Sequence, residues 1–343
     1  MFQVTRRKLL STSLGGAGAL ALWSMRGQLG LASPPGVLSA TEPVVRSTKA
    51  LGSSVSITIV HPDAKLAERA IDAAFAEVRE IEKVLSIYLP DSQVSRLNRE
   101  GAEKAIDAHP HLLTMLSASM ELARRTQGAF DITVQPLWEL YAGAAREKRI
   151  PRDNEIESVR KFVDWRSIEV NGSTVRFRTP GTKITFNGIA QGYATDCARK
   201  ILQAHGIEHA LVDVGELAAV GDKPPSQTWK VGIQHPRVAD AFVAVAMLKD
   251  RGLATSGDYE TAFTPDKQFN HIFDPATGRS PTEFSSVSIA APTAAEADGL
   301  STAVFVLGFE RGMRELKSRE GVDALFVFKD GRIASTNGFP VES

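Results

Sequence analysis

A glycine-containing passage in the middle of the chain, residues 185–196, constrains the fold more than any other stretch. It has the sequence Thr-Phe-Asn-Gly-Ile-Ala-Gln-Gly-Tyr-Ala-Thr-Asp, and the apolar residues Ile184 and Phe186 predict a strand at its start. Apolar residues at helical spacing predict a helix after it that ends at Gly206. Such a turn gathers backbone N–H groups at a helix N-terminus, which suits a phosphate or another anion. A tight turn without a ligand explains the two glycines alone equally well.

Several common site types are excluded by the residues themselves. The passage has neither the G-x-G-x-x-G spacing of a dinucleotide fingerprint nor the Gly-Lys-Ser/Thr of a P-loop. Cys197 is the only cysteine, so the chain can form neither an intrachain disulfide nor a cysteine-rich metal site. The formal net charge is zero at pH 7, and no basic stretch of the mature chain suggests nucleic-acid binding.

The N-terminus has the features of an export signal. The pair Arg6 and Arg7 precedes a small, Gly- and Ala-rich apolar run that extends to about Trp23, as is typical of a Tat signal. The run is too short and too weakly apolar to span a membrane comfortably. We therefore expect residues 1–40 to be a signal peptide and linker, and residues 41–343 to form one periplasmic domain without a transmembrane segment. A disordered basic tail is the alternative.

The order of the predicted elements favours an α+β fold over a doubly wound sheet, because strands and helices are clustered and do not alternate strictly. We expect mixed, mainly antiparallel sheets with packed helices. Periodicity and turn residues predict helices over 64–86, 110–126 and 293–307, the last closed by Gly308. They predict strands at 51–60, 168–177 as a hairpin over Asn171-Gly172, 210–215, 229–234, 241–248, 285–291 and 324–333 as a second hairpin. Residues 252–258 and 270–275 are predicted to be loops.

Three features of the sequence could carry chemistry. Asp298 and Thr302 are four residues apart on a predicted helix, so they share a face and could offer hard oxygen ligands to Mg²⁺. His271, in a polar loop, could be a general base or a ligand contact, although most single histidines are neither. Phe130 and Asp131 could stack on and hydrogen-bond a flat heterocycle. The alternatives are a polar helix face for the first pair and a core aromatic with a capping residue for the last.

Seven segments taken together resemble the ApbE family of FAD:protein FMN transferases, in family order and over about residues 44–339. They are Ala-Leu-Gly-Ser (50–53), Leu-Ser-Ile-Tyr-Leu-Pro-Asp-Ser through Leu-Asn (85–98), Gly-Ala-Phe-Asp (128–131), Gly-Ile-Ala-Gln-Gly-Tyr-Ala-Thr-Asp (188–196), Ala-Thr-Ser-Gly-Asp-Tyr (254–259), His-Ile-Phe-Asp-Pro-Ala-Thr-Gly (271–278) and Ala-Asp-Gly-Leu-Ser-Thr-Ala (297–303). Each segment is modest alone, and their order is what makes the resemblance specific.

The resemblance implies a site for FAD and one for Mg²⁺. The positions that match the FAD site are Leu51, Tyr88, Ala129, Phe130, Asp131, Gln191, Asp196, Thr255, Ser256 and His271. The positions that match the Mg²⁺ ligands are Asp298, Thr302 and the backbone carbonyl of Gly188. His271 also matches the family histidine near the reacting phosphate, and it is the expected catalytic residue.

The chain departs from the family pattern at three places. Gln191 stands where the family usually has Lys, and Thr185-Phe186-Asn187-Gly188 replaces its Asp-x-Gly-Gly. Gly215-Glu216-Leu217 replaces the usual Gly-Gly-Asp. Gly-Ile-Ala-Gln-Gly-Tyr and Val-Gly-Glu look like the NosX branch, which is associated with nitrous oxide reductase maturation.

The resemblance leads us to expect a Mg²⁺-dependent enzyme that passes FMN from FAD to a Ser or Thr of a partner electron-transfer flavoprotein, NosR-like, with release of AMP. A non-catalytic FAD-binding assembly factor is one alternative, and an FAD pyrophosphatase that supplies FMN is another. The presence of Asp298 and Thr302 argues against a mere carrier. The sequence does not separate the transferase from the hydrolase.

Overall fold

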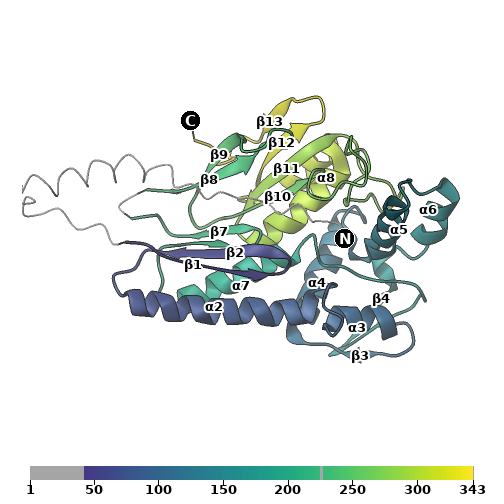
Figure 1. Cartoon of the computed structure of the whole chain (residues 1–343), viewed down its shortest axis with the longest axis horizontal. Helices are drawn as coiled ribbons and strands as arrows, with labels where there is room; N and C mark the ends of the chain where they lie inside the picture. The colour runs from purple at the N-terminus through teal and green to yellow at the C-terminus, as the bar shows by residue number, and fades with distance from the viewer. Residues whose placement is uncertain (1–41, 225–226, 343) are drawn as a thin grey trace, which may run out of the picture.

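The computed structural model describes residues 42–224 and 227–342, so the predicted export signal lies outside the described residues. The fold is built on one large antiparallel sheet (Figure 1). In spatial order its strands are β1 (Val44–Ala50), β2 (Ser53–Ile59), β6 (Ala210–Asp213), β7 (Leu217–Val220), β10 (Gly252–Gly257), β11 (Phe284–Ala291), β12 (Asp323–Phe328) and β13 (Ile333–Ser335). The expected α+β fold with mainly antiparallel sheets is thus confirmed.

Helices and two small sheets complete the described chain. The helices are α2 (Ala64–Leu85), α3 (Gln93–Glu100), α4 (Pro110–Arg125), α5 (Gln135–Arg146), α6 (Asp153–Arg160), α7 (Ala190–Ala204) and α8 (Ala294–Lys317), with the short 3-10 turns η1 (Ile132–Val134) and η2 (Trp165–Ser167). One small sheet consists of β3 (Ile106–Asp107), β5 (Thr174–Phe177) and β4 (Ile168–Asn171), and the other is the hairpin of β8 (Trp229–Gln234) and β9 (Phe242–Leu248).

The large sheet lies between helices on one face and the β8–β9 hairpin on the other. In Figure 1, α2 runs below the sheet with α7 beside it, and α8 crosses behind β10 and β11. Alternate residues of β2, such as Ile57 and Ile59, are fully buried in the main core with these helices. On the opposite face, Trp229 and Leu248 of the hairpin form a second core with sheet residues such as Leu253. This alternation is expected of a sheet that is covered on both faces.

Most predicted helix boundaries are confirmed by local capping. The side chain of Asp63 accepts the Leu66 N–H at 3.0 Å at the start of α2, and Ser92 caps α3 in the same way. Gly128 takes a φ of +84° just after α4, and its N–H donates to Ala123 O at 2.8 Å. These are short-range signals, which is why the sequence alone predicts them.

Three predictions were wrong or incomplete, and some elements were not predicted. Residues 252–258 do not form a loop, because Gly252–Gly257 is strand β10, paired with both β7 and β11. Ile184 is in no strand, and the Asn98 side chain binds its N–H and its carbonyl at 2.7 and 2.8 Å. Gly308 kinks α8 with φ 76° and ψ 174°, but the helix resumes and ends at Lys317. The sequence also did not predict β1, β7, α5 or α6.

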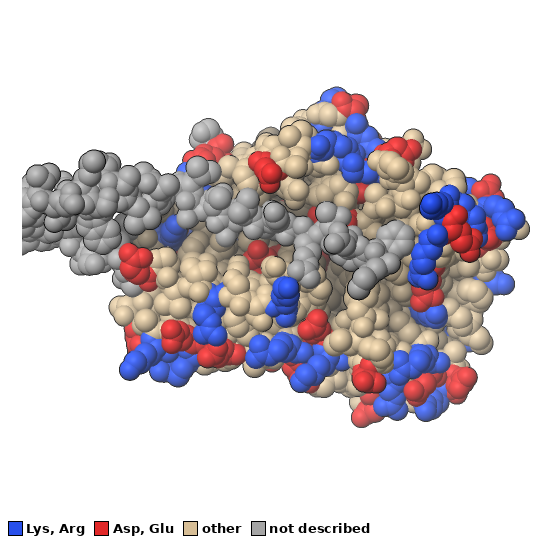
Figure 2. All heavy atoms as spheres, in the orientation of Figure 1, with Lys and Arg blue, Asp and Glu red and all other residues tan. Residues whose placement is uncertain are grey.

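Charged side chains of both signs are interspersed along the edge of the molecule formed by α2 and α3 (Figure 2). Many belong to short-range ion pairs, such as Lys83 with Glu80 and Arg96 with Glu100. No helix in the described part of the chain combines the length and the apolar composition that crossing a membrane requires.

Candidate functional site

A cavity of about 700 Å³ opens where the β1–β2 turn, the end of α2, η1, the start of α7, the end of β10 and one face of α8 meet. It is large enough for a cofactor-sized ligand. The residues predicted for FAD and Mg²⁺ that line it are Leu51, Tyr88, Ala129, Phe130, Asp131, Gly188, Gln191, Thr255, Ser256, His271, Asp298 and Thr302. The structure thus brings together in space twelve positions that are widely separated in the sequence.

Asp196 is the exception among the predicted residues. Its carboxylate is buried and accepts the backbone N–H groups of Ala294 and Ala295 at 3.0 and 2.9 Å, and Arg199 lies 3.3 Å away. Those N–H groups open α8, so Asp196 acts as a cap supplied by the neighbouring helix α7. It is not among the residues that line the cavity, so the expected contact with FAD stays a prediction. Its effect on the site is to fix α8 against α7.

The predicted metal residues lie together on one wall. Asp298 Oδ2 accepts the Gly192 N–H at 2.9 Å, and Thr302 Oγ1 lies 3.0 Å from Ser256 Oγ. A Cβ atom added to Gly188 would stand 3.0 Å from Thr302 Oγ1, so a glycine is what leaves room beside that hydroxyl. The prediction that Asp298 and Thr302 face the same way from one helix is confirmed.

The chemistry of these donors fits a hard cation. A carboxylate, a hydroxyl and a neighbouring backbone carbonyl are the oxygen ligands that Mg²⁺ prefers, and Mg²⁺ usually keeps further ligands from water or phosphate. Within residues 42–224 and 227–342, no three or more His, Cys, Asp or Glu residues form a group that could hold a metal ion. A site here would therefore rest on one carboxylate and several neutral oxygens, as suits an ion shared with a phosphate ligand.

His271 also lines the cavity, and it lies in the connection between β10 and β11. Its N–H donates to Thr261 O at 3.0 Å, and its ring Nδ1 lies 3.3 Å from the same carbonyl. A carbonyl can only accept, so this contact assigns the ring proton to Nδ1 and the acceptor lone pair to Nε2. A neutral imidazole held in that tautomer can take a proton from a hydroxyl.

The remaining wall is aromatic and partly acidic. Phe130 is buried in the main core, and Asp131 accepts hydrogen bonds from the N–H and the hydroxyl of Thr133 and from the Trp165 N–H. Burial raises the pKa of the Asp131 carboxyl to about 6. Both residues therefore have the structural roles weighed as alternatives, and both still line the cavity. Tyr88 stands at the rim, 61% exposed, and its hydroxyl accepts from Asn187 Nδ2 at 3.2 Å.

Gln191 lies where its amide can reach a ligand. Its Nε2 donates to Ser53 Oγ at 2.6 Å, and a Cβ atom added to Gly215 would stand 2.4 Å from the same nitrogen. The side chain therefore crosses from α7 over the β6–β7 turn to β2. Gly215, with a φ of +93°, leaves the space that this path requires.

Glu216 is a cavity residue that the sequence did not identify. It is buried, and its Oε2 accepts the Thr255 N–H at 3.2 Å. The departure from Gly-Gly at 215–216 marked the position, but only the β6–β7 pairing decides where the side chain points. Six carboxylates and no Lys or Arg are found among the described residues that line the cavity, the acids being Glu82, Asp131, Asp213, Glu216, Glu260 and Asp298.

Comparison with known proteins assigns the fold and the family. The model of the ApbE family matches residues 51–326, most of the described chain. The chain belongs to the ApbE family. An FAD:protein FMN transferase of Treponema pallidum is 30% identical over 288 residues, covering 78% of this chain and 80% of that protein. One of Escherichia coli K12 is 30% identical over 308 residues, covering 87% of each chain.

Solved structures of this family have the same fold. The ApbE protein from Thermotoga maritima superposes with a TM-score of 0.78 at 29% identity, covering 86% of this chain and 97% of that one. The apo form of the flavinyl transferase ApbE from Pseudomonas stutzeri gives 0.76 at 29% identity, covering 87% and 95%. Both likenesses extend over most of this chain and nearly all of the solved one.

Proposed function

We propose that this protein is an FAD:protein FMN transferase. One observation carries the proposal: one cavity is lined by the oxygen donors of α8, by the glycine passage and by His271, in a chain of the ApbE family. The relatives that bear this name cover most of the chain at about 30% identity. FAD is the donor substrate, and a Ser or Thr hydroxyl of a second protein is the acceptor.

The transfer breaks the phosphoanhydride bond of FAD and forms a phosphoester bond to the acceptor hydroxyl. The acceptor hydroxyl oxygen attacks the phosphorus of the FMN half, the bond to the AMP phosphate breaks, and AMP leaves with the bridging oxygen. His271 Nε2 takes the hydroxyl proton, because its Nδ1 proton is held toward Thr261 O. The remaining requirement is positioning, which dominates phosphoryl-group transfer.

We also propose that the transfer depends on Mg²⁺, held by oxygen donors that line the cavity. Asp298, Thr302 and the backbone of Gly188 would hold the ion beside the pyrophosphate. When bound, Mg²⁺ neutralises the phosphate oxygens and makes the phosphorus easier to attack. The described lining has no Lys or Arg, and Gln191 replaces the usual Lys, so a cation other than a side chain must balance the pyrophosphate charge.

The partner and the compartment are also proposals. The twin-arginine start favours export to the periplasm, and the Gly-Ile-Ala-Gln-Gly-Tyr and Val-Gly-Glu segments favour the NosX branch. The acceptor would then be a NosR-like electron-transfer flavoprotein involved in nitrous oxide reductase maturation. Substituting the acceptor Ser or Thr by Ala should abolish labelling.

Intact-mass spectrometry tests the proposal. The protein is incubated with FAD, Mg²⁺ and a candidate acceptor, while chromatography follows AMP and FMN. A transferase adds one FMN to the acceptor for each AMP released, and both products disappear when EDTA is added. Release of AMP and free FMN without labelling would support the pyrophosphatase alternative. Binding of FAD without any cleavage would support the assembly factor.

A further inference from the structure

The connection from Asp258 to Glu283 leaves the large sheet at β10 and returns at β11, and it carries His271. Its two ends meet at the sheet, where the Asp258 N–H donates to Ser285 O at 3.0 Å and Gly257 pairs with Ser286. A long connection whose two ends are joined at a sheet can move as a unit unless its middle part contacts other elements. The body of the connection packs on α5 and α6 through Phe263, Phe269 and Phe273. The placement of His271 depends also on what holds the base and the far turn of this connection.

The base of the connection is held by an arginine from a distant hairpin. Asp258 is fully buried, and both of its oxygens accept from Arg237, in the β8–β9 loop, at 2.7 Å each. The same guanidinium donates to Ser285 Oγ at 2.8 Å. A two-pronged, charge-assisted pair of this kind is strong and fixes direction as well as distance. Arg237 thus joins both ends of the connection to the opposite face of the sheet.

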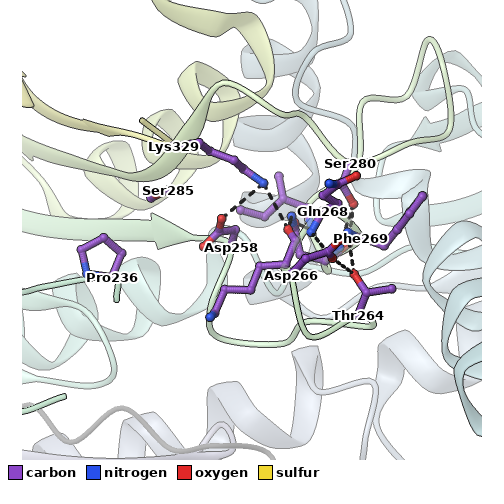
Figure 3. A network of polar contacts seen from close by, with 12 residues as sticks. Pro236, Asp258, Thr264, Asp266, Gln268, Phe269, Ser280, Ser285 and Lys329 are labelled. Carbon is purple, nitrogen blue, oxygen red and sulfur yellow. Dashed lines mark hydrogen bonds and ion pairs between the residues drawn. The ribbon is translucent and has the colours of Figure 1, made fainter. Parts of the chain in front are cut away.

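A lysine continues the network into the body of the connection. Lys329, just after β12, places its Nζ 3.4 Å from Asp258 Oδ2 and donates to Lys267 O at 3.1 Å. Figure 3 shows Lys329 between Asp258 on one side and the turn that carries Asp266 and Gln268 on the other. The Lys329 ammonium therefore connects Asp258, where the connection leaves the sheet, to the turn around Lys267.

The last link is Asn270, the residue before His271. Its Nδ2 donates to the same carbonyl, Lys267 O, at 3.2 Å, and its Oδ1 accepts the Ile272 N–H at 3.0 Å. Asn270 is fully buried, and its backbone exchanges two hydrogen bonds with Ser280 Oγ. An unbroken series of polar contacts thus runs from Arg237 through Lys329 to the backbone on both sides of His271.

We propose that Arg237 and Lys329 are positioning residues that hold the 258–283 connection so that His271 faces the cavity. Neither residue lines the cavity, so they act only through the connection. The assignment rests on the proposed function for the role of His271. Without Arg237 the Asp258 carboxylate would be buried with too few donors, and the connection would open to hydrate it. The sheet itself would stay folded, because Ile272 is the one residue of the connection among the buried residues described for its two cores.

The test compares Arg237→Met with Arg237→Lys and with the double variant Arg237→Met/Asp258→Asn. Transfer of FMN is measured at saturating FAD, and hydrogen exchange is followed peptide by peptide. We expect Arg237→Met to lower kcat about ten- to a hundredfold, as misplacing a catalytic group does, and to speed exchange within 259–283. Arg237→Lys should be intermediate, and the double variant should regain part of the loss because no buried charge remains. Added guanidinium should partly rescue Arg237→Met, since that side chain is 34% exposed.

Lys329→Met tests the contacts of Lys329 and should mainly speed hydrogen exchange in the turn around Lys267. Arg332→Met is the matched control, because Arg332 lies on the same hairpin but pairs with the exposed Asp330. Wild-type kcat and exchange in Arg237→Met would overturn the inference, and so would faster exchange spread evenly over the whole sheet. If the wild-type protein transferred no FMN, the proposed function would fail. The exchange experiment would still show whether Arg237 orders the connection.

Discussion

The two walls of the cavity are positioned by different means. On one wall, Gly188 and Gly192 place backbone beside Asp298 and Thr302, which one helix presents on a single face. On the other wall, His271 is carried by a long connection that is tied by side chains from distant strands. The first arrangement depends on backbone at the start of α7 and on the packing of α7 against α8, and the second on long side chains from distant segments. The metal wall, formed by Asp298 and Thr302, should therefore be rigid. The position of the histidine wall, formed by His271, should depend on the contacts of Arg237 and Lys329.

Buried carboxylates show the same contrast. Asp298 accepts a backbone N–H from Gly192, in the first turn of α7, so its direction is set by the contact between α7 and α8. Asp258 accepts from the side chains of Arg237 and Lys329, which belong to two other elements. Backbone donors are fixed once the local structure forms, whereas each long side chain must first be ordered. Substitutions on the two walls should therefore fail in different ways.

The largest effect is expected on the metal wall. Asp298→Ala removes the carboxylate from a site with few protein oxygens, so transfer should fall by roughly a thousandfold or more. Asp298→Asn keeps an oxygen for the Gly192 N–H and should separate the loss of charge from the loss of that hydrogen bond. Circular dichroism should show both variants folded, and calorimetry should show weakened Mg²⁺ binding. Full Mg²⁺-dependent activity in Asp298→Ala would remove this wall from the mechanism.

A smaller effect is expected at His271. His271→Asn keeps a polar side chain of similar shape but cannot take the hydroxyl proton, so flavinylation should slow by about a hundredfold or more. FAD and Mg²⁺ binding should be preserved, and rates must be compared at saturating FAD so that weaker binding does not imitate slower chemistry. A near-wild-type rate would place the proton acceptor elsewhere. Asp258 would be a poor substitute, because Arg237 occupies both of its oxygens.

The sequence predicted the metal wall better than the histidine wall for the reasons that separate them. A four-residue spacing places Asp298 and Thr302 on one face whatever surrounds the helix, and capping residues such as Asp63 act within one turn. The family resemblance identified His271, but no local pattern indicated that Arg237 and Lys329 hold its connection. Those contacts span the β8–β9 loop, β10 and β12, and their sequence separation leaves no periodic signal.

The prediction of a loop at residues 252–258, most of which form strand β10, was wrong for a related reason. Ala254, Thr255 and Ser256 are small or polar, and their flanking glycines are typical of a loop. They form a strand because β7 and β11 pair with them on both sides, and α8 covers them. Tertiary context overrides weak strand propensity in this way. Asp196 shows that a motif does not report every role of a residue: the family motif predicts a place near FAD, and the folded chain also uses its carboxylate to cap α8.

A third substitution concerns Asp131, whose carboxylate accepts from neutral groups of Thr133 and Trp165, whereas Asp258 is paired with cationic side chains. Burial raises the pKa of Asp131 to about 6 from 3.8, so the folded protein binds this proton more tightly than the unfolded chain does. This contribution to stability is present in acid and is lost as the pH rises through about 6. The shift sets an upper limit of about 3 kcal/mol, of which we expect roughly 2. Denaturation of wild type and Asp131→Asn at pH 4 and pH 7 should show the wild type losing that much relative to the variant. A pH-independent difference would mean that Asp131 stays charged.

The smallest expected effect concerns Gln191, on the rigid wall. Its amide already donates to Ser53 Oγ and lies over Gly215, so a longer Lys at this position would follow the same path and extend beyond it into the cavity. A hydrogen bond to a charged group contributes about 1.5–3 kcal/mol, and losing the Ser53 bond offsets part of that gain. We therefore expect Gln191→Lys to tighten FAD binding by about tenfold, equivalent to about 1.4 kcal/mol. The gain should be larger when Mg²⁺ is removed, because the ammonium and the metal neutralise the same pyrophosphate oxygens.

Gln191→Met, which is similar in length but neutral and without donors, is the control and should not tighten binding. Fluorescence titration of FAD with and without EDTA measures both effects. Unchanged or weaker binding in Gln191→Lys would place residue 191 away from the phosphates. The metal alone would then balance the negative charge of the pyrophosphate in this acidic cavity.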